Sequence, residues 1–158
     1  MKNGFLKVAV TTPDLRVADC EYNKNQMVEK VKKMAGEKVS LVCFPEFSLT
    51  GYTCGDLFLH DTLVEGAKDA LAAYCEETKS YEIVSVVGLP LDHNGKLYNV
   101  AAVIYGGKIL GFVPKSYLPN YSEFYEVRQF VEAPAENGEH LWKEGESVPF
   151  GANLIFTH

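Results

Sequence analysis

Residues 39–52 read VSLVCFPEFSLTGY, and the rest of the chain can be placed around this stretch. Its first half, Val39 to Phe44, is a continuous apolar run of the kind that forms a buried strand. Pro45 ends the run, and the pair Thr50-Gly51 predicts a turn beyond it. One carboxylate, Glu46, stands between the strand and the turn. Reactive groups are often placed where a rigid strand opens into a loop, so Glu46 is a candidate site residue.

Residues 113–130 read VPKSYLPNYSEFYEVRQF and show a similar arrangement. Here Lys115 ends an apolar strand, and Glu123 and Glu126 lie in the loop that follows. Two strand ends that face one cleft can present a base and a cation to the same substrate. We therefore expect the carboxylate of Glu46 to lie in direct or one-water contact with the ammonium of Lys115, with a loop carboxylate, Glu123 or Glu126, nearby.

The remaining chain alternates between strand and helix patterns and then changes to hairpins. The expected strands are residues 6–11, 39–44, 83–89, 97–105 and 108–113, and the expected helices are residues 21–35, ended by Gly36, and residues 63–74, capped by Asp61 or Thr62. This order predicts an α/β fold with residues 6–11 as a core strand. Asn94-Gly95 and Gly106-Gly107 predict turns within a meander. Residues 133–147 are expected to form a surface loop before a closing strand, and no domain boundary is expected.

Composition narrows the class of protein. The chain has 158 residues, of which 47% are hydrophobic and 23% charged, enough for one globular domain with a sizeable core. A net charge of -6 argues against a nucleic-acid partner or an anionic membrane surface. The sequence shows neither a signal peptide nor an apolar segment long enough to span a bilayer. The prediction is a cytoplasmic protein.

The four cysteines show no metal-binding or disulfide pattern. They are Cys20, Cys43, Cys54 and Cys75, without Cys-x-x-Cys spacing, and the four histidines are scattered. No metal site is predicted. Cys43 belongs to the apolar run, and Cys54 is the only cysteine outside the expected strands and helices that lies close to Glu46 in sequence. The loop would have to fold back on itself to bring this thiol and the base together. A catalytic role for the thiol of Cys54 is therefore the weaker of the two interpretations of this residue.

The stretches around Glu46 and Lys115, in this order, resemble the nitrilase superfamily, whose members cleave non-peptide carbon–nitrogen bonds with a Glu, a Lys and a Cys. The pattern Pro-Glu-x-x-Leu-Thr-Gly-Tyr with residues 56–58, and then Lys-x-x-Leu-Pro-Asn-Tyr-x-x-Phe-x-Glu-x-Arg-x-Phe, resembles one branch most closely. That branch is the amino-terminal glutaminase domain of glutamine-dependent NAD synthetases. The resemblance runs from Lys7 to the last residue, because residues 148–156 also resemble a strand entry typical of that branch.

The resemblance implies an α-β-β-α sandwich and the hydrolysis of glutamine as the small-molecule substrate. It implies Glu46 as the general base, Lys115 as the cation that stabilises the tetrahedral intermediate, and Glu126 as a carboxylate that orients Lys115 or the substrate amide. Glu123 is an alternative to Glu126. Without the resemblance, Glu46 reads as a solvated loop residue and Lys115 as a charge that protects a sheet edge.

Aromatic residues near both motifs are candidates for the wall of a glutamine pocket. Tyr52 and Phe124 are preferred, and Tyr121 and Tyr125 are also possible. The alternative interpretation is that these rings belong to the hydrophobic core.

One element of the family pattern lies outside the sequence. In the family the nucleophilic Cys follows another strand, and this chain ends at His158 before such a segment. We therefore expect residues 1–158 to be the amino-terminal portion of the hydrolase domain, a partial sandwich that does not hydrolyse glutamine by itself.

The sequence also leads to expectations about cofactors and partners. No phosphate-binding loop is present, so no cofactor is expected in this chain, and ATP and Mg²⁺ are expected only for a separate synthetase domain. Apolar surface near residues 154–156 should be open or covered by another copy, which favours a homo-oligomer. The alternatives are a stand-alone amidase acting on another amide and a non-catalytic assembly module.

Overall fold

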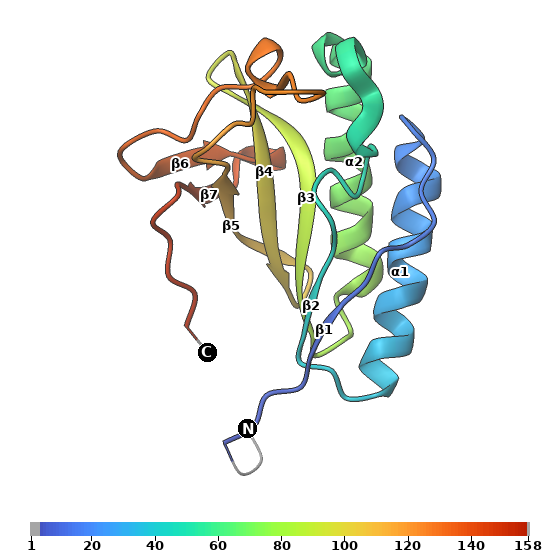
Figure 1. Ribbon diagram of the computed structural model, residues 1–158. Coiled ribbons are helices and arrows are strands. Elements are labelled where there is room, and N and C mark those ends of the chain that lie inside the picture. The colour runs from blue at the N-terminus through green and yellow to red at the C-terminus, as the bar shows by residue number, and fades with distance from the viewer. Residues whose placement is uncertain (1–3, 158) are drawn as a thin grey trace.

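The computed structural model describes residues 4–157, which form one mixed sheet with both long helices on the same side of it (Figure 1). The strand order is β1-β2-β3-β4-β5-β7-β6. The strands are β1 (Val8–Val10), β2 (Leu41–Cys43), β3 (Val84–His93), β4 (Lys96–Tyr105), β5 (Lys108–Pro114), β6 (Gly138–Leu141) and β7 (Ser147–Phe150). The helices are α1 (Cys20–Gly36) and α2 (Asp61–Thr78), with short 3-10 segments η1 (Tyr52–Leu59), η2 (Glu126–Arg128) and η3 (Lys143–Gly145).

The sheet joins parallel strands linked by helices to an antiparallel meander, as the sequence predicts, and β5 also pairs parallel with β7. Strands β1, β2 and β3 run parallel because α1 and α2 connect them as crossovers. Strands β3, β4 and β5 form the predicted meander. Asn94 and Gly95 turn the chain between β3 and β4 with φ of 54° and 73°, the left-handed values that a two-residue hairpin requires.

The two helices pack their apolar stripes on the core. Met27 and Val31 of α1 and Leu71 of α2 are fully buried. The hydroxyl of Tyr74 donates a 2.7 Å hydrogen bond to Ser85, which ties α2 to β3. The described residues include no helix long and apolar enough to cross a membrane.

The start of α2 differs from the prediction. Asp61 lies inside the first turn, and the N-cap position is occupied by His60, whose side chain makes no capping hydrogen bond. The carboxylate of Asp61 still favours this end of the helix because the helix dipole is positive there.

The prediction of a core strand over residues 6–11 is wrong. Only Val8–Val10 are in the strand, which lies at the edge of the sheet, and Val8 and Val10 are 58% and 84% exposed. Ala9 between them packs against the core. An apolar strand buries only one face when no layer covers the other, and the described residues place no layer over β1.

The prediction of a loop over residues 133–147 is also wrong, because it contains β6 and the first residue of β7. The two strands pair antiparallel, and β7 joins β5 where Phe112 lies opposite Phe150. Residues 151–157 continue without strand structure, and Ile155 and Phe156 are 88% and 40% exposed, as expected.

Candidate active site

The turn after β2 holds Glu46 against β3. The amide of Phe44 donates to the carbonyl of Val86 at 3.0 Å, and the turn closes with a bond of 3.2 Å from the amide of Ser48 to the carbonyl of Pro45. Phe47 takes a left-handed φ of 51° and is buried. A buried aromatic residue in this conformation is strained, so neighbouring structure must hold the turn in place.

Gly88 on β3 provides that support. A Cβ atom at this position would lie 2.6 Å from the amide nitrogen of Phe47 and 2.7 Å from the carbonyl oxygen of Pro45. Only glycine allows such an approach of two backbones. The side chain of Ser48 adds contacts to the backbone of Gly88, accepting from its amide at 3.2 Å. The direction of Glu46 is therefore set by β3 as well as by its own turn.

Lys115 follows β5 directly, and its ammonium lies between two carboxylates. It donates to Glu46 Oε1 at 2.7 Å and to both carboxylate oxygens of Glu126 at 3.0 Å. The predicted contact between Glu46 and Lys115, with Glu126 nearby, is confirmed. The catalytic roles of the three residues stay predictions.

Charge and burial explain why Lys115 remains an ammonium. Desolvation lowers the pKa of Lys115, but its hydrogen bonds to Glu46 and Glu126 outweigh desolvation and raise the pKa above its usual value. The Glu126 side chain is 6% exposed and that of Glu46 40% exposed. Glu126 is thus the buried partner of Lys115, and Glu46 is the carboxylate open to a ligand.

Of the two acidic residues in the loop after Lys115, the structure brings Glu126 into the site. Glu126 begins η2 and accepts a 2.5 Å hydrogen bond from the hydroxyl of Tyr52. Burial first, and then this bond, raise the pKa of Tyr52 well above its usual value, so the hydroxyl is a donor at neutral pH. Glu123 is exposed.

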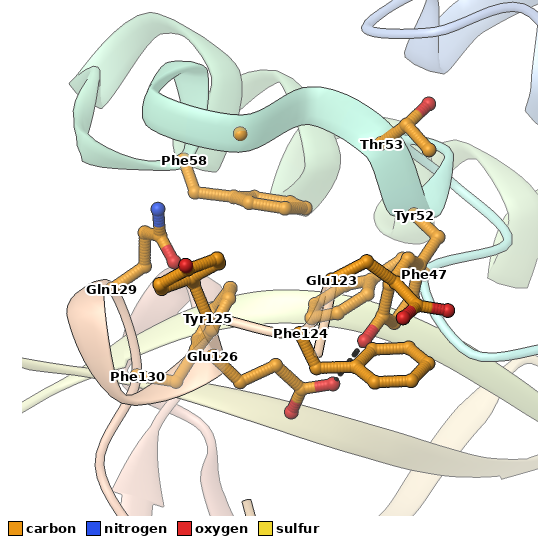
Figure 2. A pocket seen from close by; sticks show the side chains of 11 residues that line it. Phe47, Tyr52, Thr53, Phe58, Glu123, Phe124, Tyr125, Glu126, Gln129 and Phe130 are labelled. Atoms are coloured by element: carbon orange, nitrogen blue, oxygen red, sulfur yellow. Dashed lines mark hydrogen bonds between the residues drawn. The ribbon is translucent and has the colours of Figure 1, made fainter. Parts of the chain in front are cut away.

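Tyr52 and Phe124 meet edge to face, with ring centroids 6.2 Å apart, at one end of a pocket of about 250 Å³. Figure 2 shows the hydrogen bond between Tyr52 and Glu126 at this end. The pocket is lined by Phe47, Tyr52, Thr53, Gly55, Phe58, Glu123, Phe124, Tyr125, Glu126, Gln129 and Phe130. Glu46 and Lys115 do not line it. The pocket therefore lies beside the contact between these two residues, and Glu126, which lines the pocket and binds Lys115, connects the two.

The other two aromatic candidates are more peripheral. Tyr125 lines the pocket but is 66% exposed, and Tyr121 is 68% exposed and packs on Phe124 with centroids 5.6 Å apart. Phe47, Phe58 and Phe130 form the packed wall of the pocket, with centroid distances of 4.7–5.1 Å.

A surface ion pair links the two 3-10 segments beside the pocket. Arg128 of η2 donates to both carboxylate oxygens of Asp56 in η1, at 2.7 and 2.9 Å. Gln129 adds a third bond to Asp56 at 3.2 Å. This contact helps to fix η2, which carries Glu126.

Sequence reasoning missed Asn99. Its side-chain amide donates to Glu46 Oε1 at 2.7 Å, and its backbone carbonyl accepts from the amide of Lys115 at 2.9 Å. Asn99 lies in β4 and is only 3% exposed. The available signal was a single amide side chain inside an apolar strand, since a buried polar group needs a partner.

Cys20, Cys54 and Cys75 do not have the setting of an activated nucleophile. The thiol of Cys54 is buried and donates to the carbonyl of Thr50 at 3.1 Å, and desolvation raises its pKa. Burial also raises the pKa of Cys20 to about 11 and that of Cys75 to about 12. All four cysteines are free thiols. Within residues 4–157, no three His, Cys, Asp or Glu side chains group so as to hold a metal ion.

Comparison with known proteins agrees with this fold. The carbon–nitrogen hydrolase family matches residues 7–153. Glutamine-dependent NAD(+) synthetase of Mycobacterium tuberculosis is 38% identical over 156 residues, which cover 99% of this chain and 23% of that protein. The enzyme of the same name from Aquifex aeolicus is 35% identical over 126 residues, 80% of this chain and 22% of that protein. This chain thus spans about a quarter of the length of these curated relatives.

Solved structures give the same result. A glutamine-dependent NAD(+) synthetase from Cytophaga hutchinsonii superposes with a TM-score of 0.90 at 27% identity, over 97% of this chain and 26% of that one. An amidase from Nesterenkonia sp. shares the fold alone, with a TM-score of 0.70 at 17% identity, over 94% of this chain and 56% of that one. The predicted nitrilase-like fold is confirmed, and the chain belongs to the carbon–nitrogen hydrolase family.

Proposed function

We propose that residues 1–158 are the amino-terminal portion of a glutamine amidohydrolase domain that supplies ammonia to an NAD synthetase. The observation that carries this proposal is the Lys115 ammonium, directly after β5, held between Glu46 in the turn after β2 and Glu126 of η2. The relatives named glutamine-dependent NAD(+) synthetase support glutamine as the substrate. Ammonia released here would serve the ATP-dependent amidation of deamido-NAD.

The three charged side chains suit the hydrolysis of an amide by a thiol. Glu46 takes the proton of the thiol and returns it to the departing ammonia. Lys115 stabilises the negative charge that develops on the carbonyl oxygen. Glu126 holds Lys115 in place. Tyr52 and Phe124 form a wall of the substrate site at the edge of the neighbouring pocket. The nucleophile is a thiolate, which the four buried or partly buried cysteines of this chain do not provide next to Glu46.

We therefore propose that the 158-residue polypeptide alone does not release ammonia from glutamine. Its ammonia release should equal that of the Glu46→Ala variant. Release clearly above that variant would contradict the proposal, and Cys54 would then be the thiol to substitute.

The cofactors and partners follow from the same proposal. ATP and Mg²⁺ would act in a separate synthetase domain, and this chain would hold no cofactor. The small-molecule substrate is glutamine, and the acidic surface disfavours nucleic acid and anionic membranes. Four free thiols suit a reducing compartment, so we place the protein in the cytoplasm.

Copies of the chain are proposed to associate through exposed apolar side chains. These are Val8 and Val10 of the edge strand β1 and Ile155 and Phe156 of the carboxyl-terminal segment. An edge strand and apolar area both gain from a partner. Light scattering should show dimers or larger species at micromolar concentration, and a monomer with a cooperative melt at high temperature would contradict this.

A chimera tests the function directly. This chain would replace the matching residues of the Mycobacterium tuberculosis relative, and NAD formation would be measured with glutamine and with ammonia as nitrogen source. Ammonia bypasses glutamine hydrolysis and reports whether the chimera has folded. We expect activity with both sources, and loss of the glutamine reaction alone in Glu46→Gln. The matched control is Glu132→Gln, which changes an exposed carboxylate that does not line the pocket. A chimera that uses ammonia but not glutamine would contradict the proposal.

A further inference from the structure

The two carboxylates that flank Lys115 are not equivalent. Both oxygens of Glu126 accept from Lys115, and Oε1 also accepts from Tyr52. Glu46 accepts two hydrogen bonds, from Lys115 and from Asn99, and both fall on Oε1 at 2.7 Å. Its other oxygen, Oε2, accepts no hydrogen bond from any residue between 4 and 157. One oxygen of Glu46 is thus fixed and the other is free.

Asn99 occupies the position that creates this difference. Its backbone carbonyl accepts from the amide of Lys115, while its side chain donates to Glu46. One residue of β4 therefore contacts the backbone of the cation and the side chain of the carboxylate. At 3% exposure the amide of Asn99 has little access to water, so its bond to Glu46 is difficult to replace.

The last torsion of a glutamate side chain is soft and roughly two-fold. Lys115 alone could bind either oxygen of Glu46, because an ammonium directs its three donors by rotation. A second donor from a rigid strand removes this freedom. The amide of Asn99 also occupies Oε1 of Glu46 as a hydrogen-bond acceptor. Oε2 is then the oxygen of Glu46 that can accept and release a proton.

We propose that Asn99 is a positioning residue for Glu46 and that Oε2 of Glu46 is the oxygen that carries the proton during hydrolysis, an inference that rests on the proposed function. The proton leaves the thiol of the nucleophile as the S–H bond breaks and the O–H bond forms at Oε2. The thiolate forms a C–S bond with the carbonyl carbon, and the proton then moves from Oε2 to the amide nitrogen as the C–N bond breaks. Ammonia leaves, and the acyl group stays on the nucleophile as a thioester. Glu46 ends the step as the carboxylate it was at the start.

The structural half of the proposal can be tested in this chain without activity. Asn99→Leu keeps the branched shape and the number of side-chain heavy atoms but removes the donor, and Asn99→Ala is the second variant if Leu does not fold. The probe is hydrogen exchange of the Lys115 ammonium, followed by ¹⁵N NMR. We expect exchange about tenfold faster than in the unmodified chain, because Glu46 no longer holds one orientation.

Asn23 offers a matched control. It is also fully buried, and its side chain donates to the carbonyls of Arg16 and Leu49 at 2.8 and 3.0 Å. Asn23→Leu should weaken the fold and leave the exchange of Lys115 unchanged. Unchanged exchange in the Asn99 variants, or the same acceleration in Asn23→Leu, would overturn the proposal.

The catalytic half uses the chimera described above. Asn99→Leu should lower kcat for glutamine by about 10- to 100-fold, as expected for a displaced base, and change KM by less than about threefold. A variant that keeps the kcat of the parent chimera would overturn the proposal. If Lys115 exchange responds to Asn99→Leu but the parent chimera does not hydrolyse glutamine, the positioning of Glu46 stands and the proposed function fails.

Discussion

Two clusters of side chains in this fold include titratable groups, and they are held together in different ways. The Lys115 cluster consists of Glu46, Tyr52, Asn99, Lys115 and Glu126, and hydrogen bonds of 2.5–3.0 Å join its members. The hairpin cluster consists of His93, Tyr98, Phe112, His140, Trp142 and Phe150, and ring packing joins most of its members. The Lys115 cluster holds charged side chains in fixed positions, and the hairpin cluster attaches the β6–β7 hairpin to the rest of the sheet.

The hairpin cluster contains a polar atom that packing leaves unpaired. His93 and His140 face each other through Nδ1 atoms 3.1 Å apart. Nε2 of His140 has no partner, and among buried side-chain nitrogen and oxygen atoms of residues 4–157 it alone lacks one. Burial lowers the pKa of His140 to about 4, with smaller contributions from His93 and Lys68 that Asp92 partly opposes. A cluster built on packing thus keeps its histidines neutral, whereas the Lys115 cluster keeps its charges.

The largest effect is expected where the Lys115 cluster depends on backbone contact. Gly88→Ala places a methyl group against the backbone of Pro45 and Phe47 and should destabilise the fold by about 3 kcal/mol. Chemical denaturation would measure this change. Gly138→Ala in β6 is the matched control, because no atom lies within 4 Å of its added Cβ. Equal stability of the two variants would show that the turn of Glu46 does not rest on β3.

The next effect is acid instability from the hairpin cluster. The folded pKa of His140, about 4, lies below the ordinary value of 6.5, so the unfolded chain binds more protons between these values. The stabilisation is complete above pH 6.5 and is lost as the pH falls toward 4, by at most about 3 kcal/mol. Denaturation at several pH values should show this slope in the unmodified chain.

Variants separate this slope from general acid denaturation. His140→Phe preserves an aromatic ring and removes the proton site, so it should flatten the slope, whereas His60→Gln at an exposed position should retain it. The pH dependence of stability that comes from the Lys115 cluster has the opposite sign. The raised pKa of Lys115 means that its stabilisation is present below its ordinary value of 10.5 and is lost as the pH rises above it. A slope that survives in His140→Phe would contradict the assignment to His140.

A smaller effect is expected for Tyr52→Phe, which removes the neutral donor to Glu126. A hydrogen bond to a charged group contributes about 1.5–3 kcal/mol, and Glu126 keeps its bonds to Lys115, so the loss should be about 1.5 kcal/mol. Thermal denaturation measures it. Tyr125→Phe is the control, since that ring is 66% exposed. A loss of the same size in the control would show that the hydroxyl of Tyr52 is not the cause.

The sequence predicts the Lys115 cluster better than the hairpin cluster for a physical reason. Glu46 and Lys115 both interrupt apolar strands beside proline, so local pattern alone marks the points where the chain leaves the sheet. The choice of Glu126 over Glu123 came from the family resemblance, and the burial of Glu126 agrees with it. Asn99 was missed because a single amide inside an apolar strand indicates that a partner is needed but not which residue it is, and Glu46 lies 53 positions away in sequence.

The β6 strand and the exposed β1 show the two limits of pattern reading. The sequence of β6 is Gly-Glu-His-Leu, which lacks the apolar alternation of a strand, and it pairs because Val148 and Phe150 of its partner are buried. Strand β1 has the pattern of a core strand but lies at the sheet edge with Val10 84% exposed. Exposure depends on which layers cover a strand, and neighbouring residues along the chain do not encode that directly.

The smallest effect is expected for Cys54→Ala, which tests whether the thiol near Glu46 in sequence takes part in the site. Cys54 is 5% exposed, and its thiol donates to the carbonyls of Thr50 and Gly51 at 3.1 and 3.4 Å. The side chain therefore packs within η1 and the preceding turn. Its removal leaves a small cavity and should destabilise the fold by about 1 kcal/mol.

Because desolvation raises the pKa of Cys54, iodoacetamide at pH 7.5 should label this thiol only on unfolding. Lys115 exchange by ¹⁵N NMR should be the same as in the unmodified chain. Rapid labelling in the folded state, or a changed Lys115 signal in Cys54→Ala, would place the thiol within the Lys115 cluster and restore it as a candidate nucleophile.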